Sequence, residues 1–167
     1  MPSNEHVRII NSGVDIWNDW RDKNPGLIPD LSWSSISSMD LKGINLANTN
    51  LKLAFCRGCD FSNADLGRVV FFGANLENCI FNNSDMDGVN FEGALLKNSV
   101  FINSSITNCN FKLANLEGTS FENSDVTGAK KLKFEQLSKS KILTNTKFDF
   151  ALINKIRELK PSLLNGG

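Results

Sequence analysis

Apolar residues recur at every fifth position from Asp30 to about Ala129. The series starts at Leu31 and Ile36, ends at Val126, and has no charged member. A helix would space its apolar residues by about 3.6 positions and a flat strand by about 2. A sustained spacing of five therefore predicts a solenoid whose sides are each one repeat long.

Two further positions repeat with the same period. Small residues such as Ala64 and Cys79 stand two positions before each apolar centre, where they fit inside the coil beside a large side chain. In most repeats Gly or Asn stands two positions after the centre, as at Gly73 and Asn78. Both residue types tolerate the positive φ that the third position of a type II turn requires. Each repeat is therefore predicted to be a short extended side followed by a corner.

The order of the centres indicates the number of sides in a coil. From Phe61 to Phe121 every tenth residue is Phe, and the centres between them are Leu, Met, Ile or Val. A square coil of twenty residues stacks like on like, whereas a triangular coil would stack Phe on an aliphatic side chain. We therefore expect four repeats per coil. About five coils, separated by ~4.8 Å, would make a rod roughly 24 Å long.

Several repeats match the A(D/N)LXX signature, namely Ala64-Asp65-Leu66, Ala74-Asn75-Leu76 and Ala114-Asn115-Leu116. On these units the chain resembles the pentapeptide-repeat proteins. The resemblance implies an all-β solenoid, a right-handed quadrilateral β-helix closed at its ends by helices. It also implies no assigned activity for most members, mimicry of duplex DNA toward DNA gyrase for a few, and a homodimer contact through the carboxy-terminal cap for some.

The flanking segments are predicted to be these caps. Residues Glu5 to Lys23 have an amphipathic pattern that ends at Asn24 and Pro25, which predicts one amino-terminal helix. Two short helices are expected at Lys133–Ser140 and Phe150–Lys160. The expected organisation is a lead-in and capping helix at 1–29, the β-helix at 30–129 and a helical cap at 130–167.

Charge is balanced overall but unevenly placed. The formal net charge is zero, which argues against direct nucleic-acid binding by the whole chain. Residues 61–128 hold eight acidic and three basic residues, whereas residues 129–167 hold nine basic and three acidic ones. No secretory signal and no stretch long enough to span a membrane is present in the sequence, so we expect a cytoplasmic protein without membrane contact.

Candidate catalytic and metal-binding residues have a structural explanation. Cys56 and Cys59 have CxxC spacing, yet both fall on interior positions of the repeat, as do Cys79 and Cys109. The only histidine, His6, lies in the predicted cap helix, and no phosphate-binding glycine loop occurs. We therefore expect no enzyme activity, no cofactor and no metal.

Function is then expected on the outer faces, where two apolar groups break the polar pattern. The first is an apolar patch made of Ile80, Val100 and Ile102. The second is a cluster made of Leu53, Phe55 and Leu95, with Leu113 beside it. Exposed apolar groups on a rigid rod usually mark contacts, so the favoured function is a protein–protein interaction scaffold.

An acidic column provides the alternative. Asp65, Asp85, Asp87 and Asp125 are predicted to point outward along one side. In this hypothesis the column mimics DNA and binds DNA gyrase or another DNA-binding protein. Four carboxylates are few for imitating a duplex that carries one charge per about 1.7 Å.

Overall fold

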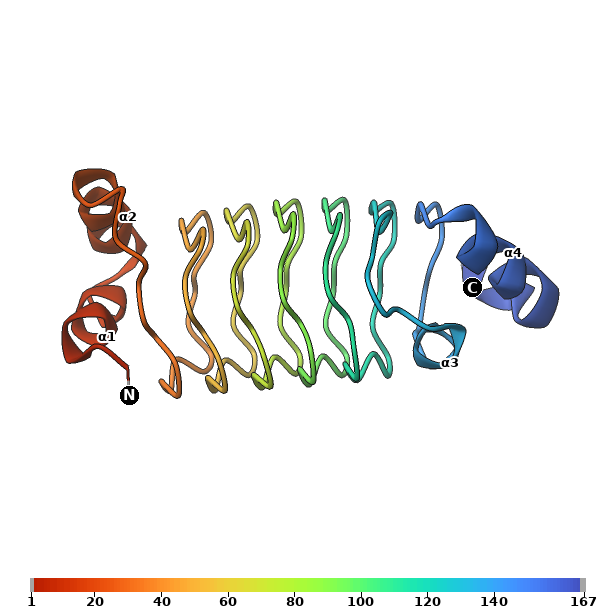
Figure 1. The fold of residues 1–167 in the computed structure, drawn as a ribbon, viewed down its shortest axis with the longest axis horizontal. Helices are drawn as coiled ribbons and strands as arrows, with labels where there is room; N and C mark the ends of the chain where they lie inside the picture. The colour runs from red at the N-terminus through yellow and green to blue at the C-terminus, as the bar shows by residue number, and fades with distance from the viewer. Residues whose placement is uncertain (1, 166–167) are drawn as a thin grey trace.

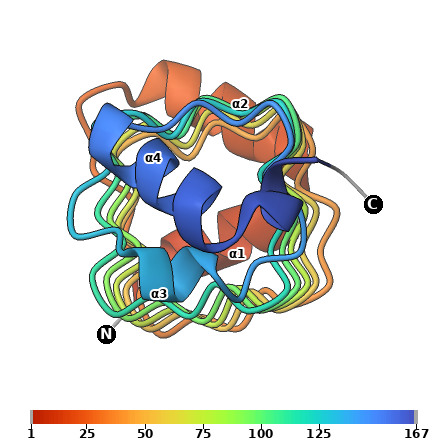
Figure 2. The same cartoon turned by 90° about the vertical axis from the view of Figure 1, so that its right-hand side faces the viewer.

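The computed structural model describes residues 2–165, which form a straight stack of coils between two helical ends (Figure 1). Seen along the stack, the coils superimpose as a square with rounded corners (Figure 2). The helices are α1 (Asn4–Asn11), α2 (Val14–Lys23), α3 (Phe134–Leu137), α4 (Phe150–Leu159) and the 3₁₀ helix η1 (Pro161–Leu164).

Parallel β-bridges join residues that are twenty positions apart. The first pairs Asp30 with Asn50, and the pattern goes on through Ile80 with Val100 to Asn110 with Lys130. Each side of a coil contributes only an isolated bridge, because five residues leave room for one extended residue between corners. The twenty-residue spacing confirms the prediction of four repeats per coil. The right-handed sense stays an expectation from the resemblance.

A left-handed residue makes each corner between Trp33 and Gly128. The φ angles at these twenty positions lie between 56° and 71°. The turn is closed by a backbone hydrogen bond, as from the Ala64 amide to the Phe61 carbonyl at 3.2 Å. Gly and Asn fill most corners because they take this conformation at little cost.

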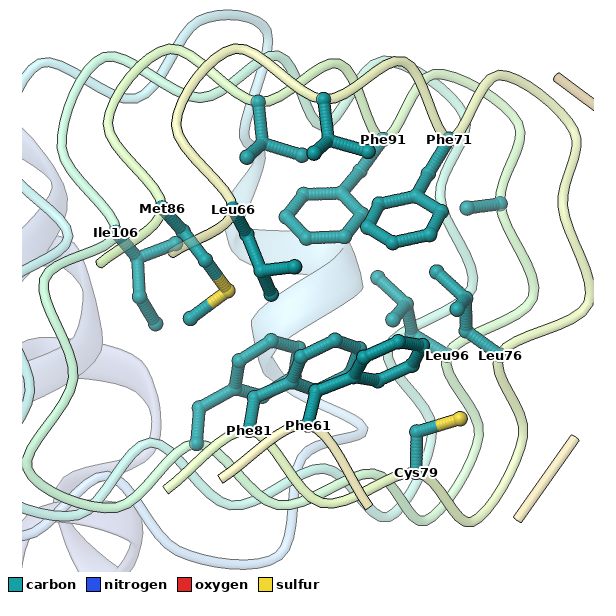
Figure 3. Packing of buried hydrophobic residues seen from close by; sticks show 14 of the residues in the cluster. Phe61, Leu66, Phe71, Leu76, Cys79, Phe81, Met86, Phe91, Leu96 and Ile106 are labelled. Carbon is teal, nitrogen blue, oxygen red and sulfur yellow. The ribbon is translucent and has the colours of Figure 1, made fainter. Parts of the chain in front are cut away.

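Stacked phenylalanine rings fill the centre of the rod (Figure 3). The Phe81 ring lies 5.2 Å from that of Phe61 and 4.7 Å from that of Phe101, and both pairs are nearly parallel. A second ladder through Phe91 meets the first edge to face, with its ring centroid 6.4 Å from that of Phe81. All these rings are fully buried, as are the aliphatic centres between them. The twenty-residue coil therefore stacks Phe on Phe and aliphatic residues on aliphatic residues, as the sequence predicts.

The small inward residues add hydrogen bonds to this core. The hydroxyl of Ser84 donates to the Phe61 carbonyl at 2.7 Å, and the hydroxyl of Ser104 donates to the Phe81 carbonyl at 2.6 Å. The thiol of Cys79 donates to the Cys56 carbonyl at 3.0 Å in the equivalent position. A hydrogen bond inside the protein offsets the free-energy cost of removing a polar group from water. Ser, Thr and Cys are therefore compatible with this interior position.

The amino-terminal cap is two helices, so the predicted single helix from Glu5 to Lys23 is wrong. The break falls at Gly13, whose φ of 109° lies outside helical space. Helix α2 then lies against the first coil. The Trp17 indole donates to the Asn45 carbonyl at 2.7 Å, and the Arg21 guanidinium donates to the Ala47 carbonyl at 2.8 Å. These contacts satisfy coil edge groups that would otherwise lack partners.

The carboxy-terminal segment differs from the predicted pair of helices. The predicted helix Lys133–Ser140 is wrong, because only the four residues of α3 are α-helical there. The predicted helix at Phe150–Lys160 corresponds to α4. Between them the chain returns to the stack, where Ile142 bridges Ser120 and Lys147 bridges Asp125. These partners are twenty-two residues apart, so the insertion that holds α3 shifts the register by two.

Candidate functional site

One corner of the rod carries a row of large apolar side chains. We define the apolar corner as Trp33, Leu53, Phe55, Phe72, Leu95 and Leu113. By register, the first, second and last of these occupy equivalent corner positions, while the others lie within two residues of that corner. Five of the six are exposed, with 80% for Leu113, 58% for Trp33, 52% for Phe55, 41% for Leu95 and 37% for Phe72. The predicted cluster Leu53, Phe55 and Leu95 is therefore part of a longer apolar surface.

Glycines shape the middle of the apolar corner. Gly73 and Gly93 occupy the corner positions between Leu53 and Leu113. A Cβ atom on Gly73 would lie 2.6 Å from a methyl carbon of Leu53, so the leucine side chain covers that glycine. A Cβ atom on Gly93 would meet only the Gly73 backbone, at 4.0 Å. The corner is therefore open at Gly93, with Leu95 beside it.

Three residues of the apolar corner have an unfavourable backbone conformation. Trp33, Leu53 and Leu113 have φ angles of 61°, 57° and 60°, where most other corners use Gly or Asn. A residue with a Cβ atom loses about 1–2 kcal/mol in this conformation. Burial does not offset that cost at Trp33 and Leu113, because both are mostly exposed. Such outliers cluster at functional sites, and here they coincide with the exposed apolar side chains.

The apolar patch of Ile80, Val100 and Ile102 is less accessible. Ile80 bridges Val100 in the next coil, so the structure brings the predicted residues together. All three are half-buried rather than exposed. The patch ends in a surface hollow of about 390 Å³, where Ser120 is buried and its hydroxyl has no hydrogen-bond partner among the described residues.

The acidic column has a structural role in the turns. Asp65, Asp85 and Asp125 lie one residue before a centre, and in each a side-chain oxygen accepts a hydrogen bond from the backbone amide two residues later, at 3.0–3.2 Å. Asn75 and Asn90 make the same bond in other repeats. The local structure therefore uses the side-chain oxygen and not the negative charge.

Hydrogen bonds and nearby positive charges lower the pKa of two of these carboxylates. The hydroxyl of Thr107 and the amide of Asn108 both donate to Asp87 at 2.7 Å and lower its pKa. The hydroxyl of Thr127 donates to Asp125 at 2.7 Å and lowers the pKa of that carboxyl. Lys147 lies 3.6 Å from Asp125 and also favours its charged form. These hydrogen bonds keep both carboxylates ionised, and Lys147 offsets part of the charge of Asp125.

The four cysteines are buried thiols that form no disulfide. Burial raises the pKa of Cys59 to about 11 and of Cys79 and Cys109 to about 12, and raises that of Cys56 well above its usual value. Thiols with such pKa values are poor nucleophiles at neutral pH. Among residues 2–165, no group of three or more His, Cys, Asp or Glu side chains is arranged to hold a metal ion.

Two family models cover most of the repeat array. One describes a pentapeptide repeat region and matches residues 56–131, and the other describes eight copies of pentapeptide repeats and matches residues 30–68. The chain belongs to the pentapeptide-repeat family. No curated protein matches the sequence of this pentapeptide-repeat protein. Within residues 2–165, none of its helices combines the length and apolarity needed to cross a bilayer.

Solved structures of other pentapeptide-repeat proteins are similar to this chain. HetL, involved in heterocyst differentiation regulation in the cyanobacterium Nostoc sp. strain PCC 7120, is 19% identical, with 70% of this chain and 62% of HetL covered and a TM-score of 0.39. Rfr23 from the cyanobacterium Cyanothece 51142 is 26% identical, with coverages of 66% and 64% and a TM-score of 0.36. QnrB1, a plasmid-mediated fluoroquinolone resistance protein, is 16% identical, with coverages of 80% and 90% and a TM-score of 0.33. The chain spans less than two thirds of HetL and Rfr23.

Proposed function

We propose that this pentapeptide-repeat protein is a non-enzymatic binding module that holds a protein partner against its apolar corner. The observation that carries the proposal is the row of exposed Trp, Phe and Leu side chains, two of which combine high exposure with a costly positive φ. Apolar side chains on a rigid surface bind without a large loss of conformational entropy. The four free thiols fit a reducing compartment such as the cytoplasm.

A capture experiment tests this function against the other apolar surface. Phe55→Ser combined with Leu95→Ser removes two exposed side chains of the apolar corner. The matched control changes the patch by Ile80→Ser, Val100→Ser and Ile102→Ser. Each immobilised protein is cross-linked in cytosol of the source organism, and thermal unfolding verifies that each variant is folded. We expect the corner variant to lose proteins that the wild type and the control retain; equal capture by the corner variant would contradict the proposal.

The alternative function is a DNA mimic that binds DNA gyrase, and one observation favours it. Asp65 and Asp85 are exposed and bridge each other in consecutive coils. Replacing Asp65, Asp85, Asp87 and Asp125 by Asn removes the charge while an amide oxygen remains for the turn, as at Asn75 and Asn90. Inhibition of gyrase supercoiling at low salt by the wild type, but not by the amide variant, would support the DNA mimic and reject the binding module as the function. No inhibition by the wild type rejects gyrase as the target.

A further inference from the structure

The apolar corner ends in a hollow at the carboxy-terminal cap. The hollow has a volume of about 550 Å³ and is lined by Lys112, Leu113, Ala114, Lys131, Lys133 and Gln136. The exposed Leu113 provides its apolar wall. Its floor is held in place by Gln136 of α3, whose side-chain amide donates to the carbonyls of Phe111 and Ala114, both at 2.9 Å. A shaped recess therefore continues the apolar corner.

Three lysines border this hollow, and nearby carboxylates offset only part of their positive charge. Lys112 is paired with Glu92 at 2.7 Å. The acidic residues near the hollow are also occupied, because Glu117 pairs with Lys97 at 2.8 Å and Glu135 pairs with Lys155 at 3.2 Å. Within residues 2–165, neither Lys131 nor Lys133 has an ion-pair partner. A ligand that contacts both the apolar wall at Leu113 and the two lysines must therefore combine an apolar group with negative charge.

We infer that the apolar corner binds an extended segment of a partner protein whose apolar side chains are followed by an acidic end. The acidic end lies in the hollow at Lys131 and Lys133, and the apolar side chains lie along the corner toward Trp33. This inference rests on the proposed function and names the class of partner. It places an interaction at both the β-helix and its carboxy-terminal cap.

The dimensions of the corner fit an extended chain. Trp33 and Leu113 occupy the same corner four coils apart, which is about 19 Å at the usual strand spacing. An extended peptide of about six residues spans this distance at ~3.3 Å per residue. The open position at Gly93 gives one apolar side chain room to approach the backbone next to Leu95. A peptide therefore reaches from the hollow to the far end of the corner.

Nucleic acid is a poor fit to the same surface. Duplex DNA carries one negative charge per about 1.7 Å, and binding it requires many basic contacts. Among residues 2–165, the hollow presents only two lysines without an ion-pair partner, and they lie beside the apolar corner. A single acidic end on an apolar segment matches this arrangement better than a uniform polyanion does.

Fluorescence anisotropy with synthetic peptides tests the inference on the full chain. The probe is a fluorescein-labelled peptide of about six alternating leucine and serine residues followed by three aspartates, matching the length of the corner. One control peptide ends in three lysines, and another replaces the leucines by alanines. The variant Lys131→Glu with Lys133→Glu is compared with Arg8→Glu with Lys141→Glu, which changes the net charge equally at sites outside the hollow.

We expect the aspartate peptide to bind the wild type and the Arg8/Lys141 control, and to bind the Lys131/Lys133 variant at least about tenfold more weakly. The variant should bind the lysine peptide instead, and binding to the wild type should weaken as salt rises. Leu113→Asn should also weaken binding while leaving the protein at least as stable, because Asn accepts the positive φ.

The inference is overturned if the wild type does not bind the aspartate peptide, or binds the aspartate and lysine peptides equally. It is also overturned if an unlabelled DNA duplex displaces the peptide while the alanine peptide binds as well as the leucine peptide. Such failures leave the binding module intact if the Phe55 and Leu95 substitutions still abolish cross-linked capture. Loss of the proposed function would appear instead as capture that is unaffected by those two substitutions.

Discussion

At the scale of single residues, each layer of the core depends on contacts with the layers above and below. The Phe101 ring stacks on Phe81 at 4.7 Å and on Phe121 at 4.9 Å, and it meets Phe91 edge to face at 6.2 Å. Small inward residues join the same layers by donating to carbonyls of the preceding coil. A change at one position is therefore felt by three coils.

Truncation of one ring tests the core packing. Phe101→Ala should lower the free energy of unfolding by ~3–5 kcal/mol, because it leaves a cavity between two stacked rings. Phe72→Ala serves as the control, since Phe72 is 37% exposed and lies outside the coil. Urea unfolding followed by circular dichroism gives both values. Equal effects of the two substitutions would contradict the assigned interior register.

The hydrogen bond from Thr127 to Asp125 predicts a pH effect. This bond lowers the folded-state pKa of Asp125 below its usual 3.8, so its contribution to stability is present above that pH and is lost as the pH falls through the folded-state pKa. Thr127→Val should therefore lower the thermal midpoint near neutral pH and have little effect in strong acid. A difference between wild type and variant that is constant across the titration would contradict this assignment.

At the scale of elements, helix α2 protects the open end of the first coil. Besides the contacts of Trp17 and Arg21, the Asn18 side chain accepts from the Asn45 amide at 2.8 Å and donates to the Gly43 carbonyl at 3.0 Å. Four backbone groups of the coil edge, on the alternate residues Gly43, Asn45 and Ala47, thus find partners on one helix. An unpaired edge of this kind would otherwise be available to a second chain.

Removal of the amino-terminal cap tests this role. Deletion of residues 1–24 should cause aggregation, because it uncovers both the apolar core and the edge of the first coil. The point variant Trp17→Ala should lower stability without removing the helices, whereas Ile16→Ala, at a residue 54% exposed, should have little effect. Light scattering and thermal unfolding measure these outcomes. A soluble deletion variant with unchanged stability would show that α1 and α2 do not protect the end.

The elements were predictable to the extent that they follow the five-residue period. The alternation of Phe and aliphatic centres indicates the twenty-residue coil because identical ladders must stack. The break at Gly13 and the return of the chain at 141–148 depend instead on how α2 and α3 fit the end coils. Because the register shifts by two residues after α3, Ile142 does not fall on the five-residue series that the sequence reveals.

The candidate surface was predictable only in part. Leu53, Phe55 and Leu95 are visible as apolar residues at outward positions, and the structure places them on one corner. Trp33 joins them from the equivalent corner one coil before Leu53, and Phe72 joins them from the position next to the corner at Gly73. The signal that revealed Leu53 and Leu113, a large apolar residue at a corner where Gly or Asn is usual, was missed at Trp33.

At the scale of the whole molecule, the carboxy-terminal end offers a second contact surface. Helix α4 exposes Phe150 by 80% and Leu159 by 55%. A homodimer through this cap, as the family resemblance implies, should be detected by sedimentation equilibrium and abolished by Phe150→Ser with Leu159→Ser. Phe72→Ser, which changes the apolar corner, should leave the dimer intact. A wild type that stays monomeric at all concentrations would contradict this prediction.

Because the bridges join residues twenty positions apart, the length of the rod changes in steps of one coil. Removing residues 71–90 would join Val70 to Phe91 and keep every later residue on its own face, while shortening the rod by one division of ~4.8 Å. Adding a single five-residue repeat would instead turn all later residues by one face and divide the apolar corner between two corners. The length of this protein can therefore change only in whole coils if its apolar corner is to stay continuous.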